Sequence, residues 1–294
     1  MLWKWLTISF AVAAALVEVS CSGGSTLPKP GSPGHYWAGA NAAYKAGDFV
    51  KTDEELQRIL VSENEFTARA RVWDMVISGG LAQGYAALSD VYESGARANR
   101  ENPLPYRKRV SELRALSGNM AIQLAEDVHK YVEQDKEPNA LLAFGFPAGS
   151  AAEPSGIVRV SKGLFVQDAE QAPLQAAMLQ RGVLLTLCSF TGNTDDAAKT
   201  LQLFQTPEVR VPRDTLLLAA AKRLYEASDV YTDKKLDLPN KLKIVSVEAL
   251  GALKAIPETK DTKALTDKIQ KAMKKARLDG GVALLRNAPR EIRV

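Results

Sequence analysis

"ANAAYKAGDFVKTDEELQRIL", residues 40–60, places a glycine, an acidic residue and an aromatic residue between two stretches of helical spacing. Glycine readily adopts the left-handed backbone that ends a helix, so Gly47 is predicted to end the first one. Asp48 can accept hydrogen bonds from the first N–H groups of the next helix, and Phe49 can fill the space between the two. This stretch therefore predicts a turn, Gly47-Asp48-Phe49, that joins two antiparallel helices.

The same stretch resembles one tetratricopeptide repeat (TPR), a family in which two antiparallel helices pack through small residues and a Gly-Asp-aromatic turn reverses the chain. Ala40 matches the small residue of the first helix, and Tyr44 lies three residues before the glycine. Thr52 departs from the pattern, because the family usually has alanine there, and this predicts looser packing of the second helix. The resemblance implies a stack of helix pairs with a concave surface used for binding.

Two weaker echoes of the turn follow. In "RGVLLTLCSFTGNTDDAAKTLQLF", Gly192-Asn193 matches the turn, Ala197 the small residue five positions after the glycine, and Leu201 the later apolar residue. "AAAKRLYEASDVY" is a poorer match, with Ser228-Asp229-Val230 at the turn. The two better turns lie 145 residues apart, which is not a multiple of the roughly 34-residue TPR period. We therefore predict a divergent stack rather than a regular array.

The predicted fold class is all-α: stacked antiparallel helix pairs, a TPR-like α-solenoid, over residues 35–278. No strand pattern of period two persists along the chain. An irregular insert that covers part of the core is predicted at 138–166, and a linker between two domains is the alternative. Gly79-Gly80 is a candidate kink, and a weakly ordered tail is expected at 279–294. The expected helices are 36–46, 50–61, 66–97, 106–132, 168–190, 193–205, 212–231, 240–256 and 261–278.

The composition is that of an ordinary globular protein, with 46% hydrophobic and 24% charged residues among 294. The net charge of +4 is too small to indicate nucleic acid, so no nucleic-acid partner is predicted. The first residues are typical of an export signal, because Lys4 precedes an apolar run, Leu6–Val17. That run is too short to span a bilayer, which takes roughly 20 residues. A signal peptide is therefore expected at 1–20.

The apolar run ends in "VEVSCSGGS", which looks like a bacterial lipobox with Cys21 as the acylated N-terminus of the mature protein. Glu18 stands where a lipobox usually has an apolar residue, and ordinary cleavage after Ser22 is the alternative. A Gly-, Ser- and Pro-rich stretch, 21–34, is predicted to be a flexible tether. Because Ser22 after the cysteine resembles an outer-membrane sorting signal, the expected location is the cell envelope, lipid-anchored in the outer membrane and facing the periplasm.

No motif of a catalytic or metal site is present in the sequence. The two histidines, His35 and His129, match no metal spacing, and Cys188 lies in an apolar run, where cysteine is usually a small buried hydrophobe. Acidic residues at 53–55 and 195–196 begin predicted helices, where they favour the helix dipole. We therefore predict no cofactor, no metal and no enzymatic activity.

Two functions from different classes follow. The leading one is a lipid-anchored helical-repeat scaffold that binds a protein or peptide partner, for instance as an accessory of a transport or envelope complex. The alternative is a cell-envelope enzyme with a site assembled from distant residues. Asn41 and Lys45, on the first helix and without a local structural role, are the predicted partner-binding residues. The basic amphipathic helix at 261–278 lacks an aromatic anchor and is predicted to cap the stack rather than lie on lipid.

Overall fold

The computed structural model describes residues 28–147, 152, 154–164, 166, 168–194, 196–206 and 208–287, with the backbone alone for Asp168 and 277–287. The chain is predominantly helical and its helices pack against one another, so the predicted all-α class is confirmed. In chain order the helices are α1 (Pro33–Lys45), α2 (Phe49–Leu60), α3 (Thr67–Ala98), α4 (Leu104–Gln134), α5 (Gly156–Ser161), α6 (Asp168–Phe190), α7 (Ala197–Leu203), α8 (Arg213–Ala227), the 3-10 helix η1 (Ser228–Tyr231), α9 (Pro239–Lys254) and α10 (Lys260–Asn287).

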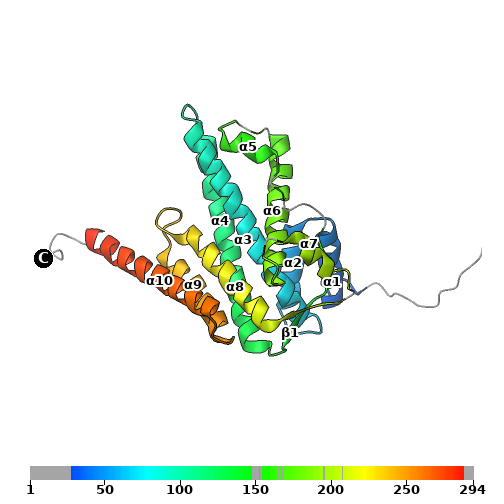
Figure 1. Cartoon of the computed structure of the whole chain (residues 1–294). Coiled ribbons are helices and arrows are strands. Elements are labelled where there is room, and N and C mark those ends of the chain that lie inside the picture. Colours follow the sequence, from blue (N-terminus) through cyan, green and yellow to red (C-terminus); the bar gives the residue numbers. More distant parts are fainter. Residues whose placement is uncertain are drawn as a thin grey trace, which may run out of the picture.

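Helix α3 forms the centre of the fold, and residues 70–82 of it are all buried. Helix α4 runs back along α3 as the second arm of a long hairpin, while α6 and α2 pack on other sides of α3 (Figure 1). Helix α9 packs on α4, and α8 and α10 both pack on α9. The pairs are unequal, with 13 and 12 residues in α1 and α2 but 32 and 31 in α3 and α4.

Glycines allow α3 and α6 to approach closely. A Cβ at Gly80 would lie 2.4 Å from the Val183 Cα, and one at Gly182 would lie 2.3 Å from the Gly80 carbonyl oxygen. Helix α3 continues through the candidate kink at Gly79-Gly80 without a break. The glycine pair therefore serves contact between two helices and does not end one.

Two short strands connect the expected irregular segment to the region before α8. β1 (Asn139–Leu142) pairs antiparallel with β2 (Val209–Pro212). The sequence shows no persistent strand pattern, because four residues are too few for an alternating pattern to stand out. Phe144, just after β1, is buried among the rings of Trp37, Tyr44 and Trp73. This part of segment 138–166 does cover the core, as predicted.

The ends of three helices differ clearly from the expected ones. The helix expected at 212–231 is α-helical only to Ala227 and continues as the 3-10 helix η1. Helix α7 is shorter than 193–205, because the capping residue of α7 is Asp196. Helix α10 continues to Asn287, so 279–287 is helical rather than a weakly ordered tail, and 288–294 lie outside the described residues. Leu265 and Ile269 of α10 are buried in the core cluster. This packing supports the interpretation of the basic helix as a cap.

Candidate functional site

The turn between α1 and α2 has the hydrogen bonds of a Schellman motif. Gly47 has φ 76°, and the N–H groups of Gly47 and Asp48 each donate to a carbonyl of the last turn of α1 at 3.0 Å. The Asp48 carboxylate accepts from the Lys51 N–H at 3.0 Å and so caps α2. Phe49 is 2% exposed and meets the Tyr44 ring edge to face. The turn residues are therefore placed by local backbone chemistry and by packing.

Two further hydrogen bonds fix this helical hairpin. The Thr52 hydroxyl is buried and donates to the Asp48 carbonyl at 2.8 Å. The Tyr44 hydroxyl donates to the Gly145 carbonyl at 2.9 Å, which ties the hairpin to the segment after β1. Thr52 therefore packs tightly, and the looser packing expected at this position is not found.

Beside the turn the surface is hollowed into an open groove of about 570 Å³, which we call the turn groove. The Arg109 guanidinium of α4 donates to the Gln175 side-chain oxygen of α6, and it forms an ion pair with Glu112 at 3.1 Å. The Gln175 amide nitrogen makes no hydrogen bond with any described residue. The walls come from the turn, α4 and α6, and the lining residues are Ala46, Gly47, Asp48, Phe49, Val50, Arg109, Gln171, Ala172, Gln175, Ala176 and Leu179.

The predicted partner-binding residues lie on α1, outside the turn groove. Asn41 is half-buried and Lys45 is exposed. Neither side chain makes a hydrogen bond or ion pair with the residues that the structure describes, and neither lines the groove. The structure brings the three turn residues to the groove but not these two, whose role in binding stays a prediction.

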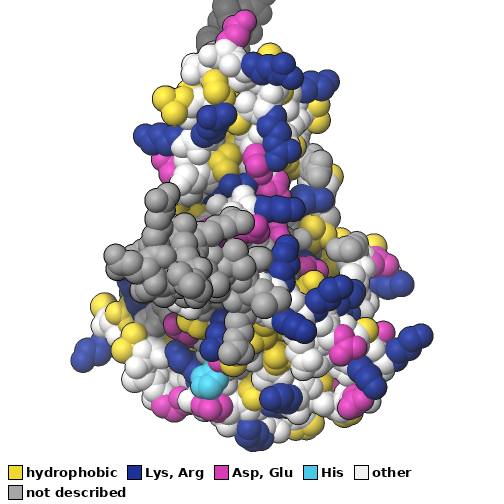
Figure 2. Space-filling model, turned by 90° about the vertical axis from the view of Figure 1, so that its left-hand side faces the viewer, with side chains coloured by type: hydrophobic (Ala, Val, Ile, Leu, Met, Phe, Trp, Pro, Cys, Tyr) yellow, Lys and Arg dark blue, Asp and Glu magenta, His cyan; other side chains and the backbone are white. Residues whose placement is uncertain are grey.

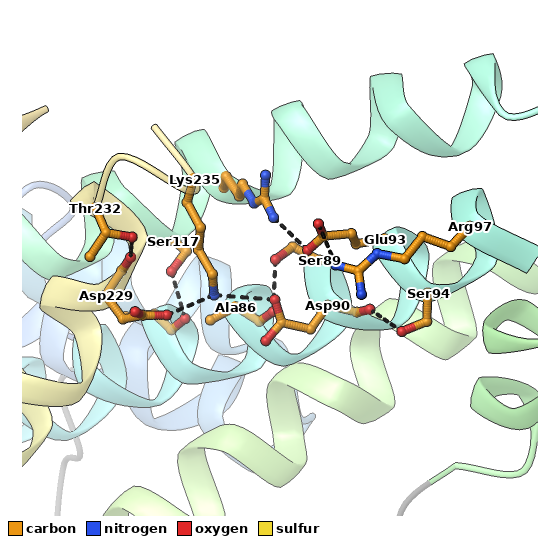
Figure 3. A network of polar contacts seen from close by, with 12 residues as sticks. Ala86, Ser89, Asp90, Glu93, Ser94, Arg97, Ser117, Asp229, Thr232 and Lys235 are labelled. Carbon is orange, nitrogen blue, oxygen red and sulfur yellow. Dashed lines mark hydrogen bonds and ion pairs between the residues drawn. The ribbon is translucent and has the colours of Figure 1, made fainter. Parts of the chain in front are cut away.

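A second cavity, of about 400 Å³, lies between the α3–α4 hairpin and the loop after η1, and we call it the cationic pocket. Glu93 joins two of its arginines, with one carboxylate oxygen 2.7 Å from Arg97 Nη2 and the other 2.7 Å from Arg114 Nη2 (Figure 3). The hydrogen bond from Arg97 holds the pKa of Glu93 below its ordinary value, against the smaller effect of burial. The lining residues are Glu93, Ala96, Arg97, Arg107, Val110, Ser111, Arg114, Lys235 and Leu236.

Lys235 is held at the edge of this pocket by two carboxylates that do not line it. Its ammonium lies 2.9 Å from Asp229 Oδ2 and 3.2 Å from Asp90 Oδ1 (Figure 3). Burial acts to lower the pKa of Lys235, but the two carboxylates outweigh it, and the pKa lies above its ordinary value. Lys235 therefore remains a cation, and its charge is already balanced.

An acidic cluster, Asp53, Asp74 and Asp127, forms where α2, α3 and α4 meet in the core. The Gln123 amide donates to Asp53 at 2.5 Å, and the Gln57 amide donates to Asp74 at 2.5 Å. Burial, followed by the charge of Asp74, raises the pKa of Asp53 to about 8. Burial also raises the pKa of Asp127 to about 6, and burial together with the neighbouring Asp127 raises that of Asp74 well above its ordinary value. The cluster therefore favours bound protons.

The interpretation of Asp53 as a helix-dipole charge needs correction, because its side chain is turned into the core and Asp53 is only 8% exposed. None of the three aspartates lines the turn groove or the cationic pocket. Within the described ranges, no three His, Cys, Asp or Glu side chains are placed to hold a metal ion. The cluster can hold protons, but neither cavity gives a substrate access to it.

The remaining candidate residues lie apart from both cavities. Cys21, the predicted lipidation residue, lies outside the described residues. Cys188 is fully buried, as its apolar surroundings predict. The two histidines lie on different helices, His35 on α1 and His129 on α4, where His129 Nδ1 is 3.0 Å from a carboxylate oxygen of Glu248. No helix in the described part of the chain has the length and apolar character needed to cross a bilayer.

Sequence reasoning missed the cationic pocket. The available signal was the density of basic residues in "RANRENPLPYRKRVSELR", residues 97–114, which straddles the tip of the α3–α4 hairpin. A helical hairpin brings the two ends of such a stretch together, so Arg97 and Arg114 meet at Glu93. Lys235 joins them from a distant loop, for which the sequence offers no signal.

Comparisons with protein-family models, with curated proteins and with solved structures found no match to this chain. The geometry of the turn groove, the cationic pocket and the acidic cluster therefore carries the functional argument.

Proposed function

We propose that this protein is a lipid-anchored scaffold of the cell envelope that binds an extended segment of a partner protein in the turn groove. The observation that carries the proposal is the open groove of about 570 Å³ beside the helical hairpin, with small residues on both walls. Ala46 and Gly47 lie on one wall. Ala172 and Ala176, one helical turn apart on α6, lie on the other. Small side chains let a peptide backbone approach the surface closely.

The polar groups of the groove suit a peptide backbone. An extended peptide presents one N–H donor and one C=O acceptor per residue. Arg109 supplies guanidinium donors, and Gln175 supplies an amide nitrogen that no described residue uses. Neither group is a nucleophile or an acid–base pair, which favours binding over catalysis. The alternative of an envelope enzyme has no comparable support, because the acidic cluster lines neither cavity.

The proposed anchor is an acyl group on Cys21, which would keep the groove near the membrane. The predicted tether at 21–34 is shorter than expected, because α1 begins at Pro33. Replacing Cys21 by Ser should prevent incorporation of labelled fatty acid and release the protein from the membrane fraction. An unacylated mature N-terminus at Gly23 would contradict the anchor without affecting the groove.

The groove itself is tested by photo-crosslinking in intact cells. A photoreactive amino acid at position 175 should give one discrete product with a partner, whereas the same group at Gln202, an exposed glutamine of α7 outside the groove, should not. Ala176→Arg should fill the groove and abolish the product. Because Ala176 is exposed, this variant should keep the melting temperature of the unaltered protein. Equal products from both positions, or a product that survives Ala176→Arg, would exclude the groove as the binding surface.

A further inference from the structure

We propose that the cationic pocket is a binding site for a doubly charged phosphate group, as carried by a phosphomonoester. The pocket and the turn groove share no lining residue, so this site is separate from the proposed partner surface. Its four basic side chains come from three parts of the chain: α3, the first turns of α4, and the loop after η1.

The charges in the pocket are only partly balanced. Glu93 cancels one of the two charges of Arg97 and Arg114, since each of its oxygens pairs with one of these arginines. Arg107 adds a second uncancelled charge, because its guanidinium forms no ion pair or hydrogen bond with the described residues. Lys235 and the two carboxylates paired with it carry a net charge of −1 together, although neither carboxylate lines the pocket. The two uncancelled arginine charges in the lining suit a phosphomonoester, which carries about two negative charges near neutral pH.

Three of the hydrogen-bond donors of the pocket lie along one stripe of α4. Arg107, Ser111 and Arg114 recur at spacings of four and three residues, so they share a helix face. The Ser111 hydroxyl has no hydrogen-bond partner among the described residues, and the Nε atom of Arg114 is buried without one. Arg97 presents its guanidinium from the opposite helix.

The placement of donors on two helices, α3 and α4, favours a phosphate ligand over a carboxylate. One guanidinium fork satisfies the two oxygens of a planar carboxylate. A phosphomonoester has three terminal oxygens arranged as part of a tetrahedron, and it needs donors from several sides. Arg97 on α3 and the stripe on α4 provide such donors, together with Ser111 as a neutral one.

The size and the surroundings of the pocket agree with this ligand. A volume of about 400 Å³ lies within the range of small-ligand sites. Ala96, Val110 and Leu236 give the pocket apolar walls beside its charges. Figure 2 shows Lys and Arg side chains spread over one face of the molecule, including its upper part, where the tip of the α3–α4 hairpin lies in Figure 1. A local excess of positive charge attracts anions towards the pocket.

Calorimetric titration of the full chain with glycerol 3-phosphate tests the site. Arg107→Ala should weaken binding roughly tenfold to hundredfold, because a charge-assisted hydrogen bond is lost. Arg107 is exposed, so the variant should melt as the unaltered protein does. Lys108→Ala removes the same charge from the next position, which is exposed but does not line the pocket, and it should bind unchanged. Dimethyl phosphate, with a single charge, should bind more weakly than glycerol 3-phosphate.

Dihexanoyl phosphatidic acid, titrated below its micelle concentration, distinguishes the source of the phosphate. Binding tighter than that of glycerol 3-phosphate assigns a lipid headgroup, and weaker binding assigns a soluble phosphomonoester. Either result supports the site if Arg107→Ala lowers the affinity for the probe that binds. The proposal would be overturned if neither probe bound. It would also be overturned if Arg107→Ala and Lys108→Ala weakened binding equally, or if dimethyl phosphate bound as tightly as glycerol 3-phosphate. None of these outcomes bears on crosslinking at Gln175, so the two proposals can fail separately.

Discussion

Two turns of this chain, Gly47–Thr52 and Gly192–Thr200, are built from the same hydrogen bonds. Each ends a helix at a glycine of positive φ, 76° in the first turn and 80° in the second. Each begins the next helix with an aspartate whose carboxylate accepts from the N–H three residues on, at 3.0 Å in both. A buried threonine then donates to the carbonyl of that aspartate, at 2.8 Å and 3.0 Å.

The helices that follow the two turns differ in burial. Helix α2 buries five of its 12 residues, whereas α7 buries only one of its seven. Counted from the caps, Phe49 of the first turn corresponds to Ala197 of the second, and buried Asp53 corresponds to Leu201, which is 48% exposed. The caps therefore determine where a helix begins, while the residues after the cap determine whether it joins the core.

The largest expected effect is a loss of stability with rising pH, which only the first turn carries. The pKa of Asp53 is raised from 3.8 to about 8, so the folded state binds its proton more tightly than the unfolded state does. The contribution of Asp53 to stability should therefore be greatest in acid, fall as the pH rises from 3.8 to about 8, and be level above that. Each unit of the shift costs about 1.4 kcal/mol at high pH.

Asp53→Asn tests this dependence, because asparagine keeps the shape but cannot ionise. In urea unfolding at a series of pH values, the free energy of unfolding of this variant should fall less steeply with pH. At pH values above the raised pKa of Asp53, the variant should be more stable than the unaltered protein. Glu54→Gln, at an exposed neighbouring position, is the matched control and should leave the slope unchanged. An unaltered slope in Asp53→Asn would show that the proton is held elsewhere.

The second turn should respond to pH in the opposite sense. The hydrogen bond from the Lys199 N–H lowers the pKa of Asp196 below 3.8. Its stabilising contribution is therefore present above the unfolded value and is lost as the pH falls through the folded pKa. Asp196→Asn should therefore change the free energy of unfolding with pH only in the acid range, where the Asp196 carboxylate takes up its proton.

The second largest effect concerns the aromatic residue that only the first turn possesses. Phe49 is 2% exposed, and Phe49→Ala should lower the free energy of unfolding by about 3–5 kcal/mol, because a buried ring is lost and a cavity remains. Leu201→Ala, on the exposed side of α7, should change it by less than about 0.5 kcal/mol. Equal losses at the two sites, measured by urea unfolding, would mean that α7 contributes to the core as α2 does.

The glycines of the two turns should respond to alanine to different extents. A left-handed backbone costs a residue with a side chain about 1–2 kcal/mol. Gly47→Ala should cost no more than this, because no atom lies within 4 Å of the new Cβ. In Gly192→Ala the Cβ would also lie 3.1 Å from the Thr215 methyl group. Gly192→Ala should therefore have the lower melting temperature. The reverse order would show that the second turn yields more easily than its geometry indicates.

The sequence predicts the first turn because glycine, cap and aromatic residue are adjacent there. It predicts the second poorly, because three residues separate Gly192 from the cap, Asp196. Counting five positions from Gly192 selects Ala197, whereas counting from the cap selects Thr200 as the counterpart of Thr52. The threonine taken as a departure from the TPR pattern is in fact a feature that the two turns share.

The candidate sites are harder to predict than the fold, because they depend on contacts between helices. The helical pattern indicates which residues share a face of one helix, but the partner helix supplies the other half of each site. Asp53 is a surface charge by its position near a helix start, and only the packing of α2 on α3 and α4 makes it a buried acid. Arg107 and Arg114 share a face of α4 by their spacing, while Lys235 reaches them only through the fold.

The smallest expected effect tests what the two turns have in common. Thr52→Val and Thr200→Val each keep a β-branched side chain of similar shape and remove one hydroxyl. The backbone N–H of each threonine also donates to the same carbonyl, at 2.9 Å and 3.1 Å, so that acceptor stays satisfied. The loss should be about 1 kcal/mol at each site, as expected for one hydrogen bond. The Thr200 hydroxyl also lies 3.5 Å from the Thr191 hydroxyl, at the limit of hydrogen-bond distance. The two variants should therefore be similar in urea unfolding, with any excess loss at Thr200, although their helices differ in burial. A large loss at Thr52 with none at Thr200 would show that the surrounding core, rather than the hydroxyl bond, holds the start of α2.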